Sequence, residues 1–187
     1  MLRFPALFLT IALFSGTAQI WRPLTDAERD AKTPRIDKNA DAEILLWDVY
    51  VTDMIEGPER GAHVTHNYKR IRVFNERGAE AQAKVTIPFT PLRKSSIADV
   101  KGRTIKPDGT IVELKGDQIF ENVLAKFGKK TSVKAKTFSL PGVVPGSIIE
   151  YSWREVISEY TPPYVTQALQ SEIPTWELNY HVVPRPS

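Results

Sequence analysis

The stretch that decides the fold is Lys136-Thr-Phe-Ser-Leu-Pro-Gly-Val-Val-Pro-Gly-Ser-Ile-Ile-Glu-Tyr151, in which two Pro-Gly pairs separate two runs rich in β-formers. Proline fixes φ near a turn value and glycine accepts positive φ, so each pair can reverse the chain. The pattern predicts a strand, a tight turn and a second strand. A similar reverse turn is predicted at Lys106-Pro-Asp-Gly109, before the short run 110–114.

Alternating apolar and polar residues predict further strands on both sides of these turns. In the first run Trp47, Val49 and Val51 alternate with more polar neighbours, which is typical of a half-buried strand. The expected strands are 43–53, 63–74, 83–89, 97–105, 110–114, 134–140, 147–157, 165–173 and 176–183, with a turn at 75–78. Eight or nine short strands at this spacing predict an all-β antiparallel sandwich.

Two helical segments are also expected. Thr25 followed by Glu28 forms a capping box, which predicts a short helix in the polar leader 19–41 before Pro34 stops it. The leader has few apolar residues to bury, so a loosely held arm and a disordered segment are both open. Apolar residues at helical spacing, closed by Gly128, predict a helical crossover over 118–130; they are Ile119, Phe120, Val123, Leu124 and Phe127.

The first residues have the pattern of a secretory signal. Arg3 precedes a short apolar run at 4–14, and small residues end at Ala18, which predicts a signal peptide 1–18 that is cleaved. An uncleaved anchor is the alternative, although the apolar run is shorter than the roughly 20 residues that span a bilayer. We therefore expect a periplasmic or extracellular protein with a β-sandwich domain at 42–184 and a tail or linker at 185–187.

Composition excludes several classes of function. The 187 residues contain no cysteine, so the chain has no disulfide framework, no thiolate metal site and no cysteine nucleophile. A formal net charge of +3 is too small for a dedicated nucleic-acid-binding domain.

No arrangement of residues specifies a reaction. His63 and His66 are three apart on a predicted strand, so they face opposite sides and cannot share a metal ion without a bulge. Ser147 is better explained as the first residue of a strand after a turn. The carboxylates Asp48, Asp53, Glu150 and Glu155 alternate with apolar residues, which favours a solvated sheet face. We expect no catalytic residue, no cofactor and no metal site.

Two segments are candidates for contact with a partner or ligand. Lys126, Lys129 and Lys130, with Lys134 and Lys136 nearby, could meet an anionic polymer, phospholipid head groups or an acidic partner. The alternative, which we favour, is a solvated loop that protects an edge strand from aggregation. The second segment is a predicted loop in which Tyr160, Pro162, Pro163 and Tyr164 would be exposed. The aromatic residues Trp47, Tyr151, Trp153, Tyr160, Tyr164, Trp176 and Tyr180 could line a sugar or peptide groove, or pack in the core.

Several of these motifs together resemble a known family. Ala40-Asp-Ala-Glu-Ile-Leu-Leu46, Thr104-Ile-Lys-Pro-Asp-Gly-Thr-Ile-Val112, the stretch 138–151, Gln170-Ser-Glu-Ile-Pro174 and Tyr180-His-Val-Val-Pro184 are similar to the bacterial domain of unknown function that precedes transglutaminase-like cores in exported proteins. The resemblance spans roughly Asp37 to Pro184.

The resemblance implies a β-sandwich accessory module. Its partner would be a transglutaminase-like cysteine enzyme domain, either downstream in the same polypeptide or on another chain. Since this chain has no cysteine, none of the partner's catalytic residues can be assigned to it. We therefore expect a non-catalytic module that packs against such an enzyme or presents substrate to it. The alternative is a stand-alone envelope-binding module that recognises glycan or peptide through an aromatic groove.

Overall fold

The computed structural model describes residues 21–55, 61–91, 94–127, 131–158 and 168–183, and within these ranges the chain forms nine strands and a few short helices. The helices are α1 (Asp26–Arg29), α2 (Glu76–Ala83) and a 3-10 turn (Gly116–Gln118). The strands are β1 (Ala42–Ile55), β2 (Gly61–Val73), β3 (Lys84–Phe89), β4 (Ser95–Ile105), β5 (Ile111–Glu113), β6 (Phe120–Phe127), β7 (Thr131–Ser139), β8 (Ile148–Ile157) and β9 (Leu178–Val183). No helix of the described part is long and apolar enough to cross a membrane.

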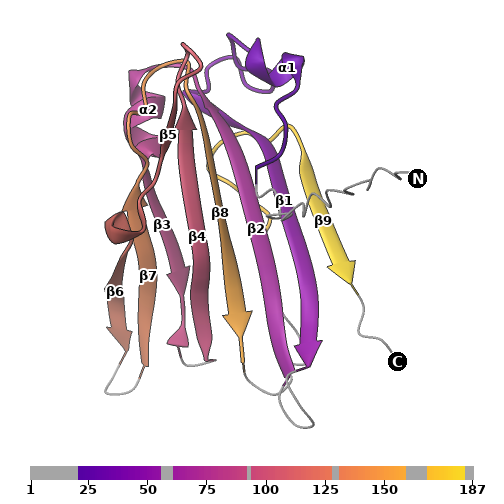
Figure 1. Cartoon of the computed structure of the whole chain (residues 1–187), viewed down its shortest axis with the longest axis vertical. Helices are drawn as coiled ribbons and strands as arrows, with labels where there is room; N and C mark the ends of the chain where they lie inside the picture. Colours follow the sequence, from indigo (N-terminus) through magenta and orange to yellow (C-terminus); the bar gives the residue numbers. More distant parts are fainter. Residues whose placement is uncertain (1–20, 56–60, 92–93, 128–130, 159–167, 184–187) are drawn as a thin grey trace, which may run out of the picture.

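The strands form two sheets, which confirms the predicted all-β, sandwich-like architecture. The large sheet has the order β5-β4-β8-β2-β1-β9 and the small sheet the order β3-β7-β6. The sheets are offset, so that β6 and β9 lie at opposite sides of the molecule (Figure 1). Strand β9 pairs with β1 in parallel, with Trp47 opposite Leu178, so the expected purely antiparallel arrangement is wrong at this edge.

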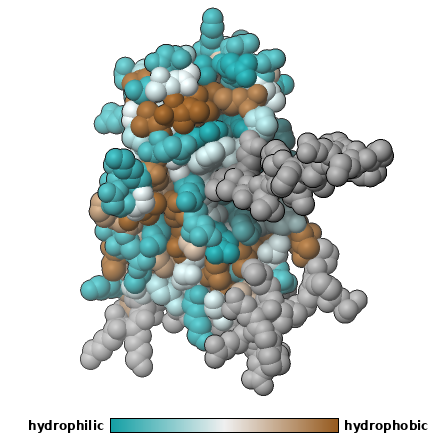
Figure 2. Space-filling model, viewed as in Figure 1, coloured by the Kyte–Doolittle hydropathy of each residue, from teal (hydrophilic) through white to brown (hydrophobic). Residues whose placement is uncertain are grey.

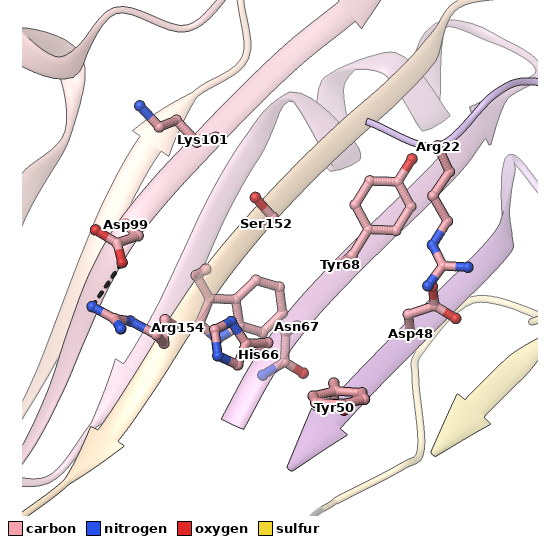
Figure 3. A pocket seen from close by; sticks show the side chains of 11 residues that line it. Arg22, Asp48, Tyr50, His66, Asn67, Tyr68, Asp99, Lys101, Ser152 and Arg154 are labelled. Carbon is pink, nitrogen blue, oxygen red and sulfur yellow. Dashed lines mark ion pairs between the residues drawn. The ribbon is translucent and has the colours of Figure 1, made fainter. Parts of the chain in front are cut away.

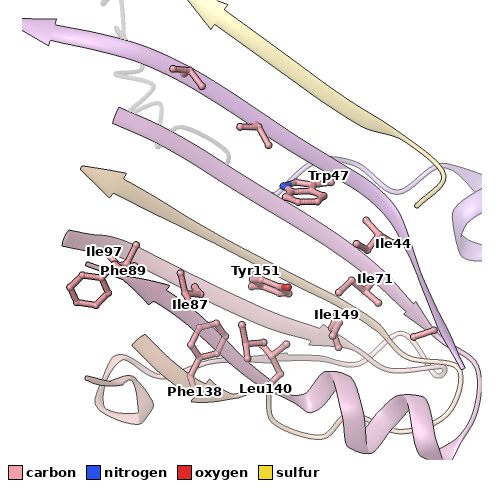
Figure 4. Packing of buried hydrophobic residues seen from close by; sticks show 14 residues of the cluster. Ile44, Trp47, Ile71, Ile87, Phe89, Ile97, Phe138, Leu140, Ile149 and Tyr151 are labelled. Carbon is pink, nitrogen blue, oxygen red and sulfur yellow. The ribbon is translucent and has the colours of Figure 1, made fainter. Parts of the chain in front are cut away.

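The core fills the space between the sheets (Figure 4). Ile44, Trp47, Ile71, Ile149 and Tyr151 of the large sheet belong to one buried cluster that includes residues of the small sheet. The small sheet contributes Val85, Ile87, Phe89 and Phe138. Full burial of such a side chain stabilises the fold by about 1.5–3 kcal/mol, so these alternating faces determine how the sheets pack.

The two predicted Pro-Gly turns and the Pro-Asp-Gly turn are confirmed. Gly142 and Gly146 have φ values of 69° and 81°, which a residue with a side chain rarely adopts. At the third turn, Gly109 has a φ of 84° and its N–H donates to the Lys106 carbonyl over 2.9 Å. The turns therefore join β7 to β8 and β4 to β5 as the sequence indicates.

The structure corrects the expected helical crossover over 118–130, because residues 120–127 form strand β6. A β-bulge between Val123 and Ala125 inserts Leu124 into this strand. The extra residue interrupts the alternation of side chains along the strand. The apolar residues of β6 are exposed, so their helical spacing does not mark a buried helix face.

Two further expectations are wrong. The turn expected at 75–78 begins helix α2, whose N-cap Asn75 accepts the Gly78 N–H over 2.9 Å. Gly78 packs against the backbone of Asp41, where a Cβ would lie 2.1 Å from the carbonyl oxygen. The strand expected at 165–173 is absent from its described part, 168–173, which is a connection between β8 and β9.

Candidate functional site

The outward face of the large sheet collects polar side chains from four neighbouring strands. Residues opposite one another in a sheet share a face, and β2 lies between β1 and β8. Tyr50 of β1 is opposite His66 of β2, which is opposite Arg154 of β8. One row further along, Asp48, Tyr68 and Ser152 are opposite one another in the same way. This register places a hydrophilic stripe across the strands.

A buried ionic cluster lies beside this stripe. Arg70 is 1% exposed, and its Nε donates to Glu150 over 2.8 Å while Nη1 donates to Glu28 of helix α1 over 2.8 Å. Glu150 is fully buried and also accepts from Arg103 Nε over 2.5 Å and from the Tyr68 hydroxyl. We name Glu28, Tyr68, Arg70, Arg103 and Glu150 the Arg70 cluster.

The electrostatics of the Arg70 cluster are balanced. Burial raises the pKa of the Tyr68 hydroxyl above its ordinary value, and the adjacent Glu150 raises it further. Burial would lower the pKa of Arg70, but hydrogen bonds to Glu28 and the charge of Glu150 raise it overall. Burial would likewise raise the pKa of Glu28, yet hydrogen bonds from Thr25 and Arg70 lower it overall. Two guanidinium groups therefore neutralise two buried carboxylates.

The Arg70 cluster holds the leader on the sheet. Arg70 donates to the carbonyl oxygens of Pro23 and Arg22 as well as to Glu28. The predicted capping box is confirmed, because the Glu28 N–H donates to Thr25 Oγ1 over 3.2 Å and the Thr25 N–H donates to Glu28 over 2.8 Å. The Arg103 guanidinium lies 4.6 Å from the ring centroid of Trp21. Residues 21–30 are thus packed on the sheet, and neither a loose arm nor a disordered segment describes them.

A second buried carboxylate fixes the rest of the leader. Glu43 accepts the N–H groups of Arg35, Ile36 and Asp37 over 2.7–3.1 Å. It also accepts from Trp176 Nε1 over 2.6 Å. Burial would raise the pKa of Glu43, but these donors lower it overall. One side chain therefore ties the leader to the segment that enters β9.

A depression of about 490 Å³ opens beside the docked leader. In Figure 3 the Arg154–Asp99 ion pair lies at one end, Arg22 and Asp48 lie at the other, and Tyr50 and His66 lie between them. Arg154 Nη2 is 2.8 Å from Asp99 Oδ2, and Arg22 pairs with Asp48. The lining side chains are Arg22, Asp48, Tyr50, His66, Asn67, Tyr68, Asp99, Lys101, Ser152, Trp153 and Arg154.

This outer-face pocket has a small excess of positive charge. Two of its three long cationic side chains are paired with carboxylates, and Lys101 has no ion pair among the described residues. Burial, and then the nearby Arg154, lower the pKa of His66, so its imidazole is neutral at pH 7. The volume falls within the roughly 300–1,000 Å³ of ligand sites. The pocket can accept a small polar or anionic molecule.

The structure accounts for the positions of the three histidines. His63 Nδ1 lies 3.0 Å from Asp53 Oδ1, whereas His66 lines the outer-face pocket on the other face. The ring of His181 is 6.1 Å from that of Tyr50. Among the described residues no group of three or more His, Asp or Glu side chains could hold a metal ion. Ser147 lies immediately before β8, and its hydroxyl accepts the Val144 N–H over 3.1 Å, as expected of a turn residue.

The expectation of solvated carboxylates is wrong for two of the four. Glu150 and Asp48 are buried because cations from other strands or from the leader reach them. Sequence reasoning missed Arg70 and Arg22 because their carboxylate partners lie far away in the sequence. It missed Glu43 because its partners are backbone N–H groups of the leader and the indole of Trp176. The alternation of Arg70 and Arg72 with Ile71 and Val73 was the available signal for a charged sheet face.

The residues predicted for partner contact are only partly described. Tyr160, Pro162, Pro163 and Tyr164 lie outside the described residues, as do Lys129 and Lys130. Lys126 lies exposed on β6. Lys134 and Lys136 on β7 both pair with Glu121, at 2.8 and 3.0 Å. The proposed aromatic groove is wrong for Trp47 and Tyr151, which are buried in the core.

Comparison with solved structures supports the fold. A crystal structure of a candidate protease from Parabacteroides distasonis matches with a TM-score of 0.62 and 17% identity, over 76% of this chain and 28% of that one. A zinc metallopeptidase from Deinococcus radiodurans matches 70% of this chain and 24% of its own with 8% identity, but with a TM-score of 0.30. The CBM3a-L domain of a Clostridium thermocellum scaffoldin matches 77% of this chain and 84% of its own length, with 10% identity and a TM-score of 0.35. The last two likenesses are too distant to carry an argument.

Comparison by sequence identifies the family. No curated protein matches the chain. A domain family described as having unknown function and a solved structure, DUF3857, matches residues 59–187. This match covers most of the chain, including eight of the nine strands in whole. The chain belongs to the DUF3857 family.

Proposed function

We propose that the chain is a non-catalytic accessory module of a transglutaminase-like cysteine enzyme, which it positions or supplies with substrate outside the cytoplasm. One observation carries the proposal: a similar fold occupies 28% of a larger protein described as a candidate protease. The chain itself has no cysteine and so cannot supply the thiolate of such an enzyme. The enzyme domain follows in the native polypeptide or belongs to another chain.

The free edge of β9 is the surface that we assign to this contact. It is the last described strand, and its second edge has no neighbour in the described sheet. Tyr180, Val182 and Val183 are exposed on it. Exposed apolar side chains on an unpaired strand are typical of a protein contact. Glu43 and Trp176 hold the segment that enters β9, so this edge has a fixed position relative to the sheet.

The native protein from an envelope fraction provides the test. We expect an intact mass well above that of residues 19–187, or co-purification with a separate protein, and in either case a cysteine that reacts with iodoacetamide. Val182→Asp should lower incorporation of a fluorescent amine into a glutamine peptide, whereas the exposed control Lys115→Asp should not. A native mass near that of residues 19–187 with no cysteine protein bound would contradict the proposal.

The outer-face pocket favours one second candidate, a stand-alone module that binds an envelope glycan or peptide. This alternative no longer depends on the aromatic groove, since Trp47 and Tyr151 are buried. A thermal-shift screen with soluble cell-wall fragments tests it. A ligand present at 100 times its Kd should stabilise the fold by about 2.7 kcal/mol. Lys101→Glu should abolish that shift, and a screen without any shift would exclude this candidate.

A further inference from the structure

Strand β6 exposes apolar side chains that the rest of the described molecule does not cover. Phe120 is 59% exposed and Phe127 is 62% exposed, and Val123 and Leu124 are about half exposed. Hydrophobic surface is visible on the side of the molecule where β6 and β7 lie (Figures 1 and 2). β6 is also the edge of the small sheet, so its outer backbone groups have no partner strand among the described residues. Such an edge can add a strand from another chain.

The register of β6 shows which of its side chains share a face. Glu121 is opposite Lys136, Val123 is opposite Lys134, and Lys126 is opposite Ser132. Every second residue of β7 points to the same face, so residues 132, 134 and 136 share one face. Their partners on β6 share that face too, and they are Glu121, Val123 and Lys126. Phe120, Asn122, Ala125 and Phe127 lie on the other face, and Leu124 is the extra residue at the bulge.

The order of residue types along β6 is the same in both directions from Val123. On either side of Val123 the strand has one small or polar residue, then one charged residue, then one phenylalanine, once the bulge residue is set aside. The two charges have opposite signs, Glu121 on one side and Lys126 on the other. Such a strand is complementary to an antiparallel copy of itself. A two-fold symmetric pair of antiparallel strands is favoured by this property, because each residue lies opposite the residue at the mirrored position of the second strand.

We propose that the partner of β6 is the β6 of a second copy of this chain. The two-fold axis passes at Val123, which faces Val123 of the second copy. Glu121 then faces Lys126, and Phe120 faces Phe127, each twice in the dimer. The small sheets join into one continuous sheet across the axis. Within the described chain Glu121 pairs with Lys134 and Lys136, and Lys126 has no ion pair, so Lys126 is available for this role.

Substitutions that reverse the charges on β6 test the pairing. They are made in the full-length protein, purified after any processing in the cell. Light scattering after size exclusion should show a dimer for the wild type. Lys126→Glu places a carboxylate opposite Glu121 at both symmetry-related positions of the dimer. It should raise the dimer Kd about tenfold or more. Glu121→Lys should do the same, with two ammonium groups. A mixture of the two variants restores opposite charges at both positions and should form heterodimers. Lys115→Glu, which changes an exposed charge outside β6, is the matched control.

A single introduced cysteine tests the register. Because the chain has no cysteine, Val123→Cys should form a disulfide-linked dimer in oxidised glutathione, since this position faces itself. Phe120→Cys is the matched control, because it faces Phe127 and should crosslink much less. A wild type that stays monomeric at about 100 μM, or variants that do not recover on mixing, would overturn the proposal. A monomer in which β6 is covered by another domain would overturn it in favour of that domain.

Discussion

The Arg70 cluster and strand β6 both depart from the usual rule that apolar side chains are buried and charged ones exposed, but in opposite ways. In the Arg70 cluster, arginine and glutamate are buried and every charge has a partner. On β6, phenylalanine, valine and leucine are exposed and the outer edge has no partner in the described chain. The first region completes its interactions within the molecule, so it explains how the leader becomes part of the fold. The second has no such partners within the described chain, and our proposal is that a second copy of the chain supplies them.

The largest effect should come from breaking the Arg70 cluster. Arg70→Met leaves Glu28 and Glu150 buried without the guanidinium that joins them, and we expect the free energy of unfolding to fall by about 3–5 kcal/mol. Urea unfolding measures it. The control is Arg29→Met, because Arg29 pairs with Asp26 on an exposed part of α1 and should cost less than about 1 kcal/mol. Equal losses for the two variants would show that the Arg70 cluster does not fix the leader.

A smaller effect is expected at Glu43. Glu43→Gln keeps the shape but replaces a carboxylate that accepts four donors, and it should lower the free energy of unfolding by about 1–3 kcal/mol at pH 7. The folded-state pKa values of Glu43 and Glu28 lie below the ordinary 4.5. Their contribution is therefore complete above about pH 4.5 and is lost as the pH falls through the lower folded values.

The acid dependence gives an independent check on Glu43. Unfolding measured from pH 7 to pH 3 should show a smaller loss for Glu43→Gln than for the wild type, because the variant has lost one of the titrating groups. An identical loss in both proteins would mean that the Glu43 charge does not stabilise the leader.

Lys69 sharpens the comparison, because it is a partly buried cation without a carboxylate partner among the described residues. Burial lowers its pKa to about 8, and Nζ lies 3.7 Å from the ring centroid of Trp47. Since the folded protein binds this proton less tightly than the unfolded chain, its cost falls as the pH rises from about 8 towards 10.5. Lys69→Met should stabilise the fold by about 1–2 kcal/mol at pH 7 and by much less at pH 10.5. A pH-independent gain would contradict this account.

The smallest effect on folding should come from β6. Phe127→Ser at low protein concentration should change the free energy of unfolding by less than about 0.5 kcal/mol, because the side chain is already exposed in the monomer. A loss above about 2 kcal/mol would show that Phe127 packs within the chain.

The sequence predicts the strands well where one face is buried and turn residues mark the ends. Trp47, Val49 and Val51 alternate as expected, and the Pro-Gly pairs at 141–146 form the turns between β7 and β8. It fails on β6, where exposure and a bulge remove the relation between apolar spacing and burial. It also fails on Asp48 and Glu150, since the arginines that pair with them come from the leader and from strands that are far away in the sequence. Ion pairs between residues so far apart in the sequence leave no local pattern.

Hydrogen exchange of the full chain at two protein concentrations tests the contrast between the two regions most directly. The account predicts that amides of residues 26–30 exchange slowly and at the same rate at both concentrations, because Arg70 fixes the leader within each chain. Peptides from residues 120–127 should exchange faster in dilute protein and become protected as the concentration rises. Fast exchange of the leader, or protection of β6 that does not depend on concentration, would contradict the account.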